Sequence, residues 1–152
     1  MNHPDYSGTI FALLRNRAMW AAGRAGDIAW FQFGGPVKNE SAAGQPRDVG
    51  EYALHIMSAW TWRTAAGFLR ADDTSEPSSL QSLADSKPCL ASSRQGDSGT
   101  LLLVFDDGDL LTIEQPPEAD IGDDAEHRRL FQPGRQTPHL VSSTSGIEWH
   151  EA

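Results

Sequence analysis

The clearest hydrophobic pattern in the chain is a period-2 alternation over residues 51–63. Its even positions are almost all large and apolar, whereas the odd positions include Glu51, His55 and Arg63. Because successive side chains of a strand point to opposite faces, this pattern predicts a half-buried strand whose even positions face the core. The segment is longer than a usual strand, so we expect a bend or bulge near Ser58.

Residues 100–114 carry the second strong pattern, two apolar runs on either side of Asp-Asp-Gly-Asp at 106–109. Asp-Gly between two apolar runs predicts a β-hairpin, because glycine adopts the left-handed backbone that tight turns need. Shorter apolar runs at 127–131, 139–143 and 147–150 predict further strands, the last of them at a sheet edge.

The N-terminal part of the chain permits two interpretations. Apolar residues at helical spacing predict a helix at 8–16. After it, residues 18–22 and 27–33 fit two strands that pair across a turn at 23–26. The alternative is one long helix that continues to Ala22. Both interpretations begin the chain with a helix.

Two polar segments separate these elements. Residues 36–48 are rich in Pro, Gly and polar side chains and predict a loop. Residues 71–99 contain only three leucines among many polar residues, so we expect a mobile, insert-like connection there.

Together the patterns predict one α+β, mainly β domain over residues 1–152. We expect an antiparallel sheet of five to seven strands, arranged as a sandwich or half-barrel, with a short N-terminal helix on one face.

The composition of the chain indicates the cellular compartment in which the protein is expected. Cys89 is the single cysteine and cannot close an internal disulfide, which suits a reducing environment. No apolar run approaches the roughly 20 residues of a membrane helix. Residues 1–7 lack the basic and apolar regions of a signal peptide. We therefore expect a cytoplasmic protein that does not contact a membrane.

The formal net charge is −9, and the acids are concentrated between residues 106 and 126, where no Lys or Arg occurs. Such a surface repels a phosphate backbone, so nucleic acid is not expected as a partner. An acidic patch can steer a basic protein, although acids also serve only for solubility. The leading hypothesis is therefore a protein-interaction module of the immunity or inhibitor type. The residues expected to contact its partner are Asp106, Asp107, Asp109, Asp120, Asp123, Asp124 and Glu126.

A second hypothesis is a small enzyme or ligand-binding domain that uses Glu51, His55 and Arg63. An acid, a base and a cation on one strand face could run hydrolytic chemistry in a cleft, although a row of salt bridges is the commoner outcome. Glu51 and His55 could also join Glu148 and His150 in a metal site. No tight metal-ligand spacing or cofactor motif accompanies them, so neither a metal nor a cofactor is predicted. The oligomeric state is left open.

Three segments of the chain resemble a family of small uncharacterised bacterial proteins. They are Val-Gly-Glu-Tyr-Ala-Leu-His at 49–55 with Ala59-Trp60 and Arg63, the hairpin positions Leu101, Leu103, Phe105 and Asp107-Gly108, and Glu-His-Arg-Arg-Leu-Phe at 126–131. In the third segment, Trp-Arg would be more usual than His-Arg-Arg. The resemblance spans most of the chain outside 71–99. It implies a shared β fold and no established activity.

Overall fold

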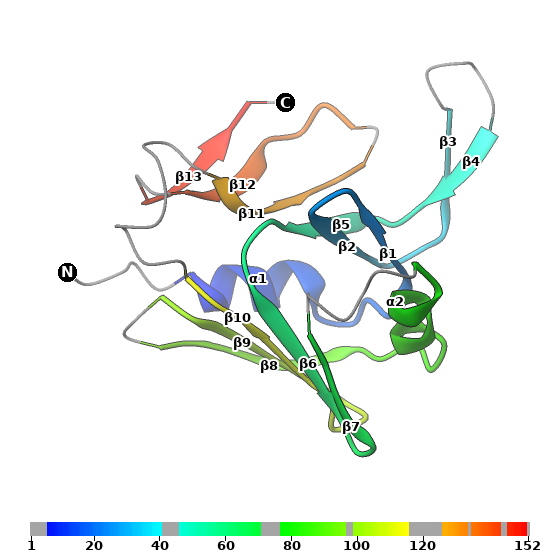
Figure 1. The fold of residues 1–152 in the computed structure, drawn as a ribbon. Coiled ribbons are helices and arrows are strands. Elements are labelled where there is room, and N and C mark those ends of the chain that lie inside the picture. The colour runs from blue at the N-terminus through cyan, green and yellow to red at the C-terminus, as the bar shows by residue number, and fades with distance from the viewer. Residues whose placement is uncertain are drawn as a thin grey trace.

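The fold consists of two antiparallel sheets with a helix between them (Figure 1). The computed structural model describes residues 6–40, 46–70, 77–96, 99–115, 126–133, 135–143 and 146–151. The six-stranded sheet has the order β1-β2-β5-β11-β12-β13, and its strands are β1 (Met19–Ala25), β2 (Ile28–Phe33), β5 (Tyr52–Ile56), β11 (Glu126–Phe131), β12 (His139–Ser143) and β13 (Gly146–His150). The five-stranded sheet has the order β7-β6-β10-β9-β8, and its strands are β7 (Gly67–Arg70), β6 (Trp60–Thr64), β10 (Leu110–Ile113), β9 (Leu101–Phe105) and β8 (Leu90–Gln95).

Three smaller elements complete the described chain. Two of them are helices, α1 (Ser7–Leu14) and α2 (Pro77–Ala84), and the third is a ribbon of β3 (Val37–Glu40) with β4 (Pro46–Val49) that projects from the body. The expected fold class, mainly β and antiparallel with a short N-terminal helix, is confirmed.

The core lies between the two sheets and is centred on aromatic side chains. Trp62 is fully buried, and its indole stacks between Phe31 of the six-stranded sheet and Phe105 of its own sheet, with ring centroids 5.6 and 4.8 Å away. Ile10 and Leu14 of α1 are buried in the same cluster. The helix therefore fills the space between the sheets.

The predicted long strand at 51–63 is two strands in two different sheets. Its alternation is confirmed, because Leu54 and Trp60 are buried while His55 is half-buried and Arg63 is exposed. The expected break near Ser58 is also present, between the end of β5 and the start of β6. At this break the chain crosses from the six-stranded to the five-stranded sheet.

At the N-terminus the structure selects the shorter helix. The single helix to Ala22 is wrong, because the chain leaves helical geometry at Arg15 (ψ 144°) and Asn16 has a left-handed φ of 65°. The predicted hairpin follows as β1 and β2. Its turn is shorter than expected: β1 continues to Ala25, and only Gly26 and Asp27 connect it to β2. Gly23 lies within β1, where the Trp30 indole occupies the space that a Cβ would need.

Two segments expected to lack regular structure contain it. The loop prediction for 36–48 is wrong where β3 pairs with β4, and residues 41–45 lie outside the described residues. The insert-like connection predicted over 71–99 contains α2 and β8. The three leucines that interrupt its polarity are buried in the main core: Leu80, Leu83 and Leu90. Whether the segment is mobile stays a prediction, and residues 71–76 and 97–98 lie outside the described residues.

The hairpin predicted at 100–114 is β9 and β10, and the three C-terminal strands are confirmed as β11, β12 and β13, the last at a sheet edge. At the opposite edge, α2 covers β1. The Gln81 side chain accepts from the Ala22 N–H at 3.3 Å and donates to the Trp20 carbonyl at 3.2 Å. A bridge between Ala18 and Cys89 then links this edge to the chain just before β8. The two sheets are therefore joined on that side.

Candidate functional site

Glu51 is positioned by a close approach of two glycine-containing segments. Its backbone N–H donates to the Gly34 carbonyl at 3.2 Å, and the Trp20 indole N–H donates to the same oxygen at 2.8 Å. Gly34 has a φ of +74°, and a Cβ there would lie 2.7 Å from Glu51 Oε1. On the other side, the Gly50 N–H donates to Gln32 Oε1 at 2.5 Å. Glycine at these positions lets the turn after β2 lie directly against Glu51.

Arg17, just beyond α1, holds the Glu51 carboxylate. Its Nε lies 3.2 Å from Glu51 Oε2, and its Nη1 donates to the Leu13 carbonyl at 2.7 Å. The guanidinium also lies over the Tyr52 ring, 5.1 Å from the centroid. Three separate contacts therefore fix Arg17 and, through it, the direction of the Glu51 side chain.

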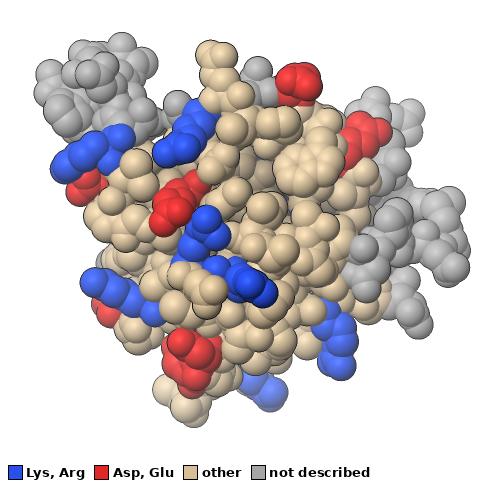
Figure 2. Space-filling view, turned by 180° about the vertical axis from the view of Figure 1, so that it is seen from behind, with Lys and Arg blue, Asp and Glu red and all other residues tan. Residues whose placement is uncertain are grey.

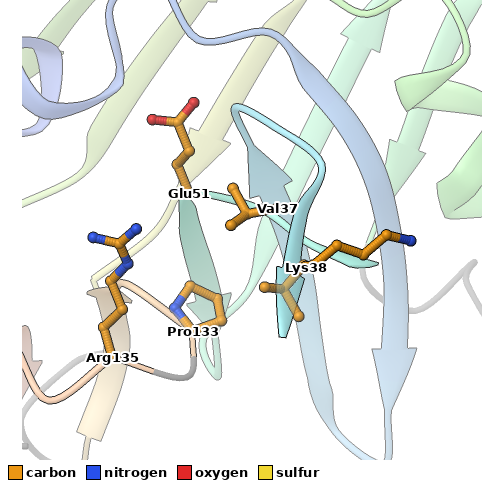
Figure 3. A pocket seen from close by; sticks show the side chains of 7 residues that line it. Val37, Lys38, Glu51, Pro133 and Arg135 are labelled. Atoms are coloured by element: carbon orange, nitrogen blue, oxygen red, sulfur yellow. The ribbon is translucent and has the colours of Figure 1, made fainter. Parts of the chain in front are cut away.

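Two hollows meet at Glu51, and we call them together the Glu51 cleft. The first has a volume of about 240 Å³ and is lined by Val37, Lys38, Val49, Gly50, Glu51, Pro133 and Arg135 (Figure 3). The second has a volume of about 340 Å³ and is lined by Ala12, Arg15, Asn16, Arg17 and Glu51. The cleft thus brings together α1, the β3–β4 ribbon, the start of β5 and the chain after β11.

The cleft is cationic although the chain as a whole is acidic. Its lining contains four Lys or Arg side chains and one acid, against a net charge of −9 for the chain. Lys38 pairs with Asp48 at 2.6 Å, and Figure 3 shows its side chain extending away from Glu51 and Arg135. Arg15 and Arg135 are exposed and form no ion pair with any described residue. Figure 2 shows Lys and Arg side chains gathered near the centre of the face turned away in Figure 1.

The three residues of the predicted enzymatic face do not form one site. Glu51 lies in the cleft, whereas His55 points to the outer face of the six-stranded sheet. There its ring is nearly perpendicular to the Phe131 ring, and the two ring centroids lie 4.7 Å apart. Arg63 lies in the other sheet, with its guanidinium over the Phe68 ring. The single-strand prediction is wrong here, because the chain changes sheets between His55 and Arg63.

The outer face of the six-stranded sheet carries a second polar cluster around Arg129. A bulge at His127 and Arg128 brings Glu126 onto the same face as Arg129, and the two form a bidentate pair at 2.5 and 3.1 Å. Arg129 Nη1 also lies 2.9 Å from His139 Nδ1. Since a guanidinium only donates, that nitrogen must accept, which makes His139 the neutral Nε2–H tautomer.

The metal site that Glu51, His55, Glu148 and His150 could have formed is not assembled within the described residues. His55 and Glu148 do share the outer face, because the strand register links them through Arg129 and Val141. Arg129 stands between them, however, and Glu148 pairs with His150 at 3.2 Å. In the part of the chain that the structure describes, no group of three or more His, Cys, Asp or Glu side chains could hold a metal ion.

The cluster on the outer face makes stability depend on pH. Burial, and then the charge of Arg129, lower the pKa of both His55 and His139. In the unfolded chain these groups regain a pKa of about 6.5, so below that pH the unfolded state binds more protons than the folded state. The stability present above about pH 6.5 should therefore decrease as the pH falls below that value, which urea unfolding at several pH values would measure. The variant His139→Asn keeps an acceptor for Arg129 and does not titrate, so its dependence should be flatter. An unchanged dependence would remove His139 from this explanation.

Among the acids expected to contact a partner, the four that the structure describes accept hydrogen bonds within the protein. In the β9–β10 turn, Asp106 accepts from the Cys89 N–H, Asp107 from the Asp109 N–H, and Asp109 from the Trp62 indole. Glu126 lies in the six-stranded sheet, whereas the other three acids lie in the β9–β10 turn of the five-stranded sheet. Asp120, Asp123 and Asp124 lie outside the described residues. Contact with a basic partner through these acids stays a prediction.

The cations of the cleft were missed from the sequence. Arg15, Arg17, Lys38 and Arg135 come from three separate parts of the chain, and none belongs to a recognisable motif. The Gly34-Gly35-Pro36 segment was the one available signal, because consecutive glycines indicate a close backbone approach.

Comparison with protein-family models, with curated proteins and with solved structures finds no match for this chain. The resemblance to small uncharacterised bacterial proteins therefore stays a prediction. Among the described residues, neither helix is long and apolar enough to cross a membrane.

Proposed function

We propose that this protein is a small binding domain that holds an anionic group of its ligand, a carboxylate or a phosphate, in the Glu51 cleft. The observation that carries the proposal is the local reversal of charge. Three arginines and one acid line the cleft of a chain whose net charge is −9, whereas the fourth lining cation, Lys38, is paired with Asp48 and extends away from Glu51 and Arg135. Concave sites with a few convergent polar groups are the usual location of ligands.

The cationic residues of the cleft have different roles in this proposal. Arg17 is committed to Glu51 and to the end of α1, so it positions the carboxylate. Arg15 and Arg135 flank Glu51 from the two hollows and are the groups that would contact the anion. A guanidinium matches a carboxylate or phosphate with two parallel hydrogen bonds, which gives direction as well as charge.

Glu51 and the apolar part of the lining restrict the ligand further. A carboxylate only accepts hydrogen bonds, so it favours a ligand that carries an N–H or O–H close to its anion. Val37 and Pro133 line the first hollow beside Arg135 and offer apolar contact. The site therefore suits a small polar molecule, or an exposed peptide group, with a donor next to an anion.

The proposal is tested by titrating the protein with inorganic phosphate and with acetate while following backbone amide resonances. We expect the amides of Gly34, Gly50 and Glu51 to shift, and equal ionic strength of sodium chloride to shift them less. Arg135→Gln and Arg15→Gln should each weaken binding at least about tenfold, since a hydrogen bond to a charged group contributes roughly 1.5–3 kcal/mol. The matched control is Arg94→Gln, an exposed arginine on β8. Equal weakening by all three substitutions would indicate nonspecific charge attraction and contradict the site.

A further inference from the structure

The edges of the two sheets differ in how they are covered. The β1 edge is covered by Gln81 of α2, and α1 packs along β8, where the Tyr6 N–H donates to Gln95 Oε1 at 3.2 Å. At the other end of the six-stranded sheet, β13 pairs with β12 alone among the described residues. An edge strand with unpaired N–H and C=O groups is a template for pairing with another strand.

β13 lacks most of the devices that usually prevent such pairing, and Glu148 is its one carboxylate. Residues 146–150 contain no Lys and no Pro, and the strand pairs with β12 without a bulge. Trp149 is 56% exposed although it lies on the core-facing side of the sheet, opposite the buried Leu140. The apolar inner surface of the sheet therefore continues to an edge where nothing described covers it.

We propose that β13 pairs antiparallel with β13 of a second copy of this chain, about a two-fold axis at Trp149. Such an interface places Trp149 opposite the partner's Trp149, and side chains that face each other this way lie within contact distance. On the outer face, Glu148 then lies opposite the partner's His150, and the symmetry repeats this pair. An axis one residue earlier would instead place Glu148 opposite the partner's Glu148, and directly opposed like charges destabilise a sheet.

Charge also favours β13 over β7, the other edge with an exposed aromatic side chain. Phe68 of β7 is 61% exposed, but it lies beneath the Arg63 guanidinium and close to Arg70 in the sequence. Two copies paired through β7 would bring these cations together without an acid from the strand itself. The self-complementary edge is therefore β13, and a two-fold interface requires such self-complementarity.

The proposal predicts a concentration-dependent dimer of the full chain, measured by sedimentation velocity between about 10 μM and about 1 mM, a range suited to a weak interface. Trp149→Lys should weaken the dimer at least about tenfold, because it sets two ammonium groups opposite each other. Phe68→Lys is the matched control and should leave the dimer unchanged. His150→Glu should also weaken the dimer, and adding Glu148→Lys should restore it, because opposite charges face each other again.

Cross-linking tests the register. In a Cys89→Ser background, Trp149→Cys sets two thiols opposite each other, and the Cα separation of about 4.5–5.5 Å in an antiparallel pair permits a disulfide. We expect a covalent dimer on mild oxidation, and none with Phe68→Cys. A chain that stays monomeric throughout the concentration range overturns the proposal. So does a dimer that Phe68→Lys dissociates and Trp149→Lys does not, or a dimer that Trp149→Cys fails to cross-link.

Discussion

Replacing Trp62 with alanine should lower the free energy of unfolding by about 3–5 kcal/mol, the range for truncating a buried aromatic side chain. Trp62 is fully buried between Phe31 and Phe105 and links the two sheets. Its indole N–H also donates to Asp109 Oδ2 at 2.9 Å, which holds the β9–β10 turn. The loss should appear as a lower midpoint in urea unfolding, read by far-UV circular dichroism.

Two variants separate the contributions to this effect. Trp62→Phe keeps much of the apolar volume and removes the donor to Asp109, so it should cost less than alanine. Trp149→Ala removes a tryptophan that is 56% exposed and should change the stability of the monomer by no more than about 0.5 kcal/mol. If Trp62→Ala and Trp149→Ala cost the same, Trp62 would not be the centre of the core.

Replacing Gly34 with alanine should lower stability by about 1–3 kcal/mol, the usual cost of a non-glycine residue in a strained backbone region, and should also abolish binding in the Glu51 cleft. The φ of +74° disfavours any residue with a Cβ, and that Cβ would lie 2.7 Å from Glu51 Oε1. Because Arg17 tethers the carboxylate, the side chain cannot move aside without losing the ion pair. Unfolding in urea and phosphate titration would measure the two effects.

Gly26→Ala is the matched control for this substitution. Gly26 has a φ of +59°, also in the left-handed region, but nothing lies within 4 Å of the position of its Cβ. It should therefore show the backbone cost alone and leave the cleft intact. If both variants lose binding equally, the contact with Glu51 does not matter.

The candidate site shows how far sequence reasoning extends. Alternation over 51–63 correctly predicted that His55 and Arg63 leave the core, because burial of the even positions determines the face of the odd ones. It could not predict that a break of three residues, 57–59, would send the two side chains to different sheets. Glu51 was identified as a candidate, but its ion-pair partner Arg17 and Arg135, which lines the same hollow, are distant in sequence and belong to no motif.

Local patterns in the sequence by themselves determined the mainly β fold class, the N-terminal helix, the β9–β10 hairpin and the C-terminal strands. Each depends on neighbouring residues, through side-chain periodicity or the turn conformation of Asp-Gly. Tertiary structure decided that α2 and β8 form in a polar segment, because Leu80, Leu83 and Leu90 gain a core built by other strands. It also decided the cationic cleft and the β13 edge, where β13 pairs with β12 alone among the described residues. Both arise where elements distant in sequence meet or fail to meet, and no local preference encodes that.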